Sequence, residues 1–154
     1  MRRAFKILGW VAAFQAVTYL VTRMLRTGAP DRPDPFADEF TLVARFEASD
    51  FGTAAPALRR ATVRATFAGV HLDLRDATLA EGGARLDLHA TFGAIEVVVR
   101  PEWRVVMRGS SFAGSLTSGV TADADLRPDA PSVVIDARAT FGAVHVRAAV
   151  REGE

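Results

Sequence analysis

Ala90-Thr91-Phe92-Gly93-Ala94-Ile95 recurs almost unchanged as Ala139-Thr140-Phe141-Gly142-Ala143-Val144, and a looser copy stands at Ala65-Thr66-Phe67-Ala68-Gly69-Val70. A fourth phenylalanine followed by small residues lies in Ser110-Ser111-Phe112-Ala113-Gly114. A unit that recurs at intervals of about 20 to 30 residues is typical of stacked repeats, in which each repeat covers the apolar face of its neighbour. The repeats therefore predict a scaffold or an interaction surface.

Alternating apolar and polar residues flank each phenylalanine. In Val63-Arg64-Ala65-Thr66-Phe67 the odd positions are apolar, and in the segment Val70–Arg75 the parity is reversed. Such alternation marks strands with one buried and one exposed face. The small residues after each phenylalanine permit a bulge or a tight corner between two strands, and we expect the phenylalanine side chain to fill the core. Residues 40–152 are therefore predicted to form an all-β domain, a short solenoid of stacked repeats or a sandwich-like relative.

The first 27 residues differ from the rest of the chain. An uncharged run, Ile7–Thr22, lies between basic residues, of which Lys6 and Arg23 are the nearest. As a helix this run spans about 24 Å, short of the ~30 Å hydrocarbon core, but both cations can reach the interface with their long side chains. Trp10 and Tyr19 lie toward its two ends, where aromatic belts form. Residues 1–27 are predicted to form one N-terminal transmembrane helix, with Lys6, Trp10, Tyr19 and Arg23 at the membrane interface.

Two other structures for this segment stay open. One is a cleaved signal peptide, although no small-x-small cleavage site is evident near Thr27–Pro30, and the other is an interfacial or partner-packed helix. Residues 28–39 are rich in proline and aspartate and are predicted to be a stiff linker. Cations are slightly denser before the helix than after it, which favours a single-pass protein of the cell membrane with the β domain outside.

Composition excludes several kinds of site. A net charge of +1 is too balanced to indicate a nucleic-acid partner. The absence of cysteine removes disulfides, zinc-thiolate sites and a thiol nucleophile. Ser110-Ser111 has no histidine or carboxylate at a triad spacing, and Gly82-Gly83 lacks a phosphate-binding pattern. We therefore predict no catalytic residue and no cofactor, and a protein that is not an enzyme.

His71, Glu96 and His145 each follow a repeat phenylalanine by four residues, so they line up if their repeats are neighbours; the Phe112 repeat offers Leu116 at this spacing. Such a row could bind a divalent metal. A solvated strand surface with polar cross-strand pairs explains the same residues, and no metal site is predicted.

In Leu72-Asp73-Leu74-Arg75 the charges of Asp73 and Arg75 face away from the leucines, and Asp76 follows them. They can pair with Arg100 or Arg147 on neighbouring repeats, as charges that fix the register, or they can form a polar recognition face. We take Asp73, Arg75 and Asp76 as candidate partner contacts.

Trp103 is a fourth candidate partner contact. It follows Pro101 at a predicted corner of a repeat, where a lone tryptophan either plugs the end of a solenoid or anchors a partner. Arg59, Arg60 and Arg64 form a small basic cluster, which is either solvated surface or a contact for anionic lipid.

The longest repeats resemble a known family. Phe67-Ala68-Gly69-Val70-His71-Leu72-Asp73-Leu74-Arg75-Asp76-Ala77 precedes the glycine turn, and Phe92-Gly93-Ala94-Ile95 opens a segment that ends in Pro101-Glu102-Trp103-Arg104-Val105. In this order the strings resemble the C-terminal domain of the LiaF-like, cell-wall-active antibiotic response proteins, also grouped as toastrack domains. The resemblance covers residues 60–115 closely and residues 40–150 loosely. It departs from the family in having room for only one transmembrane helix and in replacing several Gly-Gly pairs by Gly-Ala or Ala-Gly.

The resemblance implies a toastrack-like β domain in a membrane-associated accessory of bacterial envelope-stress sensing, which acts by contact with other membrane proteins. The alternative is a structural accessory subunit of a larger membrane complex. A conspicuous polar or aromatic patch on the β domain would favour the binding module. Exposed strand edges at the ends of the stack also predict a homo-oligomer unless they are capped.

Overall fold

The computed structural model describes residues 33–150, which are all-β apart from one short 3-10 turn at Asp123–Asp125. The strands form two five-stranded sheets in which every neighbouring pair is parallel. The predicted stacked-repeat, all-β architecture is thereby confirmed. The predicted anchor at 1–27 and most of the linker lie outside the described residues.

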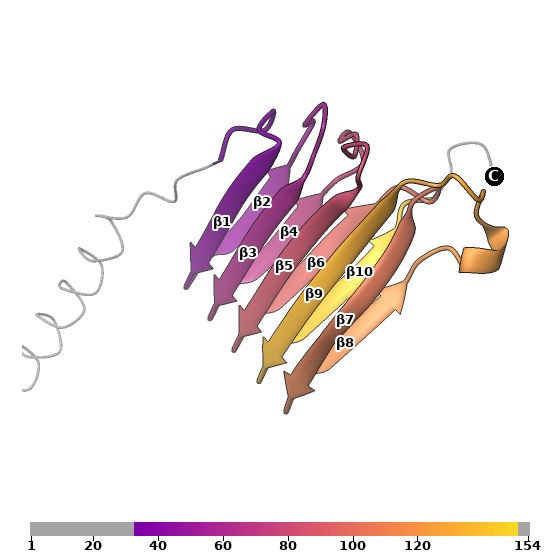
Figure 1. Cartoon of the computed structure of the whole chain (residues 1–154). Helices are drawn as coiled ribbons and strands as arrows, with labels where there is room; N and C mark the ends of the chain where they lie inside the picture. Colours follow the sequence, from indigo (N-terminus) through magenta and orange to yellow (C-terminus); the bar gives the residue numbers. More distant parts are fainter. Residues whose placement is uncertain (1–32, 151–154) are drawn as a thin grey trace, which may run out of the picture. The chain divides into compact units, whose positions relative to one another are not determined.

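Each repeat is a coil that contributes one strand to each sheet (Figure 1). In spatial order the first sheet contains β1 (Glu39–Arg45), β3 (Arg60–Thr66), β5 (Ala84–Thr91), β9 (Ser132–Thr140) and β7 (Arg104–Phe112). The second contains β2 (Ala48–Gly52), β4 (Gly69–Asp73), β6 (Ala94–Val99), β10 (Ala143–Ala148) and β8 (Ser115–Gly119). A tight corner joins the two strands of a coil, and a longer loop returns the chain to the first sheet.

The spatial order of the coils differs from their order in the sequence. The β9–β10 coil is the last one in the chain, yet it lies between the β5–β6 coil and the β7–β8 coil (Figure 1). The β7–β8 coil is consequently displaced to the end of the stack. The repeat pattern does not predict this insertion, because it identifies the coils but not their neighbours.

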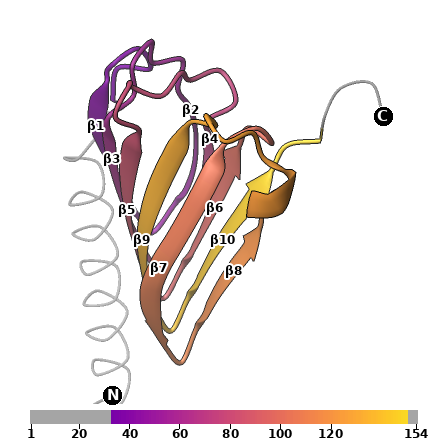
Figure 2. The same cartoon turned by 45° about the vertical axis from the view of Figure 1, so that its right-hand side comes forward.

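The core fills the space between the sheets, which meet along the corner and separate away from it (Figure 2). Small side chains lie inside next to the corner, as at Ala65, Ala90 and Ala139, and larger ones lie farther along the strands, as at Leu86 and Ile135. All five are at most 1% exposed. Burying a leucine or isoleucine side chain contributes about 1.5–3 kcal/mol, so the predicted alternation supplies the main stabilising term.

The two ends of the stack are finished differently. At the β1–β2 end, Phe40 and Phe51 pack with their ring centroids 5.1 Å apart and are 7% and 8% exposed. At the β7–β8 end, the inward-facing side chains of Val105, Met107 and Leu116 are only partly buried. Both ends present two strand edges, but aromatic rings seal the core at the β1–β2 end, whereas the core is only partly covered at the β7–β8 end.

The described end of the predicted linker is part of the folded unit. The carbonyl of Pro35 accepts a hydrogen bond from the Ala54 amide at 2.8 Å, and the carbonyl of Asp38 accepts one from the Arg59 amide at 2.8 Å. Residues from about Pro35 onward are thus tied to the first return loop rather than serving as a free spacer.

Candidate functional site

A ladder of phenylalanine rings runs along the corner of the coils. Phe46, Phe67, Phe92 and Phe141 occupy the corner with φ between 49° and 56°. Successive rings stack with centroids 4.9 to 5.2 Å apart and planes within 7° of parallel. The rings are 49–63% exposed, so the prediction that the repeat phenylalanines fill the core is wrong. We call the four rings, together with Phe112, the aromatic corner.

The left-handed backbone explains why these rings lie outside. The corner reverses the direction of the chain within two residues, and a positive φ at the first of them makes this turn at a cost of about 1–3 kcal/mol for a bulky side chain. The side chain at the turning position points away from the core, while the strand residue before it, such as Thr91, and the small residue after it complete the turn. Ring stacking offsets part of the cost, since aromatic pairs contribute about 0.5–1.5 kcal/mol beyond area burial.

The β7–β8 coil turns one residue later. Ala113, with φ of 49°, takes the left-handed position, and Phe112 is the last residue of β7. Its ring, 67% exposed, meets that of Phe141 edge-on at 84° and 5.5 Å. Because of this shift, Thr117 and not Leu116 lies beside His145 in the register of β8 and β10.

Glycines after the phenylalanines let the coils approach closely. A Cβ atom built on Gly142 would lie 2.3 Å from the carbonyl oxygen of Gly93, and one on Gly93 would lie 2.3 Å from that of Ala68. The same carbonyls accept hydrogen bonds from the next coil, from Ala143 to Gly93 at 2.9 Å and from Ala94 to Ala68 at 3.0 Å. The corner is therefore a rigid, hydrogen-bonded ridge.

The condition for aligning His71, Glu96 and His145 is met, because β4, β6 and β10 are neighbours. The register of β4, β6 and β10 places them side by side on the outer face of the second sheet, with Asp50 beyond His71. Between this row and the corner lies a row of small residues, and together the two rows line a shallow groove of about 570 Å³. The residues of the small row are Ala48, Gly69, Ala94 and Ala143.

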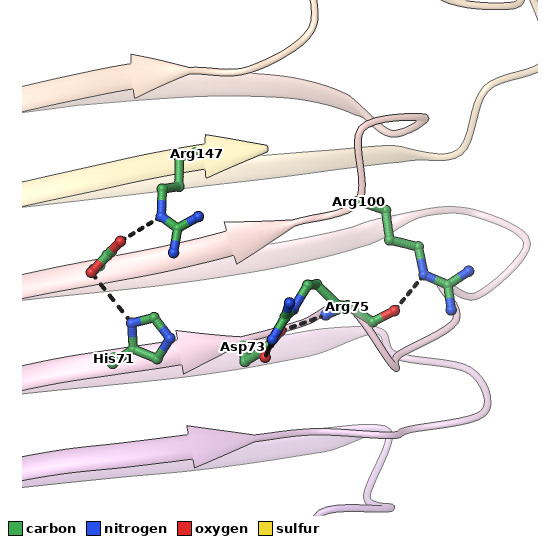
Figure 3. Close-up of polar contacts among 6 residues, drawn as sticks. His71, Asp73, Arg75, Arg100 and Arg147 are labelled. Carbon is green, nitrogen blue, oxygen red and sulfur yellow. Dashed lines mark hydrogen bonds and ion pairs between the residues drawn. The ribbon is translucent and has the colours of Figure 1, made fainter. Parts of the chain in front are cut away.

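The Glu96 carboxylate is paired with Arg147 and His71, whose side chains Figure 3 labels. The Arg147 Nε donates to its Oε1 at 2.6 Å, and the His71 Nδ1 lies 3.3 Å from its Oε2. The hydrogen bond from Arg147, and secondarily the contact with His71, lowers the pKa of Glu96 below its ordinary 4.5. Within residues 33–150 no group of three or more His, Asp or Glu side chains is placed to hold a metal ion. The row is an ion-paired surface, and its carboxylate is poorly suited to act as a general acid.

The candidate contacts Asp73, Arg75 and Asp76 lie at the opposite end of β4 from the corner. The Arg75 Nη2 donates to the Asp73 Oδ2 at 2.6 Å, and this side-chain hydrogen bond lowers the pKa of Asp73 below its ordinary 3.8. Arg100 donates from Nε to the backbone carbonyl of Arg75 at 2.6 Å (Figure 3). Arg147 pairs with Glu96 and not with Asp73. Asp73, Arg75, Asp76 and Arg100 form what we call the polar rim.

The other candidate residues are distributed as follows. Trp103 is 2% exposed and packs in the core, so its ring is not on the surface as a partner contact would require. The candidate interface residues Lys6, Trp10, Tyr19 and Arg23 lie outside the described residues. In the described part, 33–150, no helix is long and apolar enough to cross a membrane.

The aromatic corner is the feature that sequence reasoning located but misread. The available signal was the glycine that follows Phe92 and Phe141: if that glycine serves close approach between coils, the preceding residue makes the turn and faces outward. Comparison with family models, curated proteins and solved structures finds no match for this chain. The resemblance to the LiaF-like domains stays a prediction.

Proposed function

We propose that this chain is a non-enzymatic, membrane-anchored binding or regulatory module, an accessory of bacterial envelope-stress sensing. The observation that carries the proposal is the aromatic corner. Five phenylalanine rings, each about half exposed or more, form one contiguous strip on a backbone that cannot rearrange cheaply. Contiguous exposed apolar surface marks interaction sites in soluble domains.

The polar groups on the second sheet and at its rim support binding rather than catalysis. Glu96 is engaged by Arg147 and His71 and stays ionised at neutral pH, and Asp73 is engaged by Arg75. A general acid needs a raised carboxyl pKa, and both shifts run the other way.

The polar rim supports contact with a protein at the end of the coils away from the corner. The Asp73–Arg75 pair and Arg100 lie beside a shallow recess that also includes Asp76 and Glu102. Arg75 is 58% exposed at its side chain, so the pair is preorganised without being buried. Preorganised charged groups of this kind orient a partner and accelerate encounter more than they add affinity.

One observation favours the alternative, a structural accessory subunit of a larger membrane complex. The β7–β8 coil leaves two strand edges at the end of the stack, and its inward side chains Val105, Met107 and Leu116 are only partly covered. Natural sheets usually protect such edges, and a neighbouring subunit is one way to cover them.

Affinity purification of the full-length protein from native membranes in mild detergent, followed by mass spectrometry, tests the proposal. We expect a sensor or another stress-response membrane protein to co-purify, and its recovery to fall several-fold with Asp73→Asn/Arg75→Gln. Arg108→Gln, on the outer face of the other sheet, is the matched control and should not change recovery. Stoichiometric recovery of a large enzyme complex would instead establish the structural role.

A further inference from the structure

The outer face of the first sheet adds a cationic row to the aromatic corner. Arg64, His89 and Arg138 are direct neighbours in the registers of β3, β5 and β9. Each stands three residues before a corner phenylalanine, which places the row about 7–10 Å up the strands from the rings. Arg64 and Arg138 are exposed, and within residues 33–150 neither forms an ion pair with a carboxylate.

The carboxylates on the middle strands of this face lie farther from the corner and are occupied, and Glu39 stands at the far end of the edge strand β1. Asp87 and Asp136 occupy the next outward row and pair with Arg85 or Arg108. Glu47, next to Phe46, is exposed at the β1–β2 end of the corner. The middle of the face therefore runs from apolar rings, through Thr66, Thr91 and Thr140, to arginines without acidic partners.

The stacking geometry restricts what the rings can bind. Rings stacked within 7° of parallel cover one another's faces and present their edges to solvent. A sugar or a nucleobase binds an aromatic residue through the ring face, and the ladder leaves few faces free. Ring edges side by side form an apolar surface. Such a surface is better suited to insertion into an apolar medium than to binding a ligand that stacks on ring faces.

We infer that the aromatic corner docks on an anionic lipid surface, with the rings at the boundary between headgroups and acyl chains and with Arg64 and Arg138 at the lipid phosphates. Interfacial elements bury their apolar face about 5–10 Å deep, which matches the separation between rings and arginines. Arginine can bind phosphate through paired N–H donors, and its long side chain can adjust to the headgroup level. The inference rests on the proposed membrane association and adds which edge of the β domain faces the lipid.

The test uses full-length protein in lipid nanodiscs, either of neutral phosphatidylcholine or of phosphatidylcholine mixed with phosphatidylglycerol. Because the chain has no cysteine, one introduced cysteine carries a unique environment-sensitive fluorophore. Thr140→Cys places it beside Phe141, and Glu81→Cys places it in the exposed return loop between β4 and β5, at the far end of the coils. We expect brominated lipids to quench the label at position 140 and not the label at position 81, more strongly in anionic discs.

Two double variants distinguish the contribution of the rings to docking from that of the arginines. Phe67→Ser/Phe92→Ser should abolish quenching at position 140 in both lipids; Phe46→Ser/Phe112→Ser, which changes only the ends of the ladder, serves if the first variant fails to fold. Arg64→Gln/Arg138→Gln should lower the ratio of docked to undocked protein roughly fivefold per arginine, in anionic discs only.

Three outcomes overturn the inference: no quenching at position 140, equal quenching at positions 140 and 81, or quenching that does not depend on lipid charge. Protein that enters the discs without quenching at position 140 contradicts the inference alone. In that case, shielding of the same label in native membranes would show that a protein covers the corner. Protein that does not enter the discs contradicts the proposed membrane anchoring as well.

Discussion

Glycine is needed at the corner because the backbones of neighbouring coils lie too close together there for a Cβ atom. At Gly93 and Gly142 a Cβ atom would lie 2.3 Å from a backbone carbonyl oxygen of the adjacent coil, and that oxygen is fixed by its own hydrogen bond. The second coil has Ala68 at the same position. There the corresponding hydrogen bond, from Gly69 to the carbonyl of Glu47, is longer at 3.3 Å, so the outermost corner is more open.

Gly142→Ala should therefore destabilise the β domain by about 1–3 kcal/mol, because the added methyl group forces two hydrogen-bonded backbones apart. Gly69→Ala is the matched control, since a Cβ atom at Gly69 has nothing within 4 Å. Its stability should be unchanged or slightly higher, because alanine restricts the unfolded chain. Urea unfolding followed by far-ultraviolet circular dichroism measures both; equal effects of the two substitutions would refute the close-approach argument.

At the scale of strands, the sequence predicts faces well and the turning residue poorly. The alternation in β3 and β4 correctly places Val63, Ala65 and Leu72 inside, because burial on one face of a strand requires a period of two. The same pattern cannot show that Phe92 adopts a left-handed conformation, since bulky residues rarely do so. Phenylalanine is therefore assigned to the core on hydrophobicity alone, although the backbone at the corner turns it outward.

Cross-strand pairing on β4, β6 and β10 makes stability depend on pH through Glu96. Its pKa is lowered in the folded protein, chiefly by the hydrogen bond from Arg147, so the pairing stabilises the fold above the ordinary value of 4.5. This contribution is lost as the pH falls through the lower folded-state pKa. Glu96→Gln should therefore be less stable than wild type at neutral pH, and the gap should narrow between about pH 5 and pH 3.

Arg147→Gln is the companion variant, because it removes the main cause of the shift while leaving the carboxylate in place. Its stability should also converge toward that of wild type over the same range, as followed by urea unfolding at a series of pH values. Parallel curves for all three proteins would mean that the Glu96–Arg147 contact does not persist in solution.

At the scale of the whole molecule, the position of the β9–β10 coil between two earlier coils is the feature that could not be predicted from the sequence. The repeats Phe92-Gly93-Ala94 and Phe141-Gly142-Ala143 are the most alike and prove to be neighbours, but similarity alone does not exclude a stack in sequence order. The candidate site depends on this order. Arg138 joins Arg64 and His89 in one row, and Phe141 continues the ladder from Phe92, only because β9 and β10 pair with β5 and β6.

Because of the insertion, removing the last coil in the sequence breaks strand pairing on both of its sides. In a stack built in sequence order, a chain that ends after the fourth coil loses one end of the solenoid and keeps the rest, because each repeat contacts only its neighbours. Here β9 forms the whole contact between β5 and β7, and β10 forms that between β6 and β8. A stop codon after Arg127 would therefore separate the β7–β8 coil from all its partner strands.

We expect the β7–β8 coil of the chain that ends at Arg127 to lose its protease resistance and its part in cooperative unfolding, whereas in a chain that ends at Val150 this coil keeps both. Limited proteolysis and thermal unfolding monitored by circular dichroism distinguish the two. The contrary result is a shorter chain that unfolds cooperatively as a whole, with β7 and β8 paired directly to β5 and β6. That result would mean that the two orders of the coils have nearly the same free energy. The near-identical corners of the repeats make such a rearrangement sterically feasible. Hydrogen exchange would identify it by protection of β7 and β8, because β5 and β6 stay paired with β3 and β4 in either case.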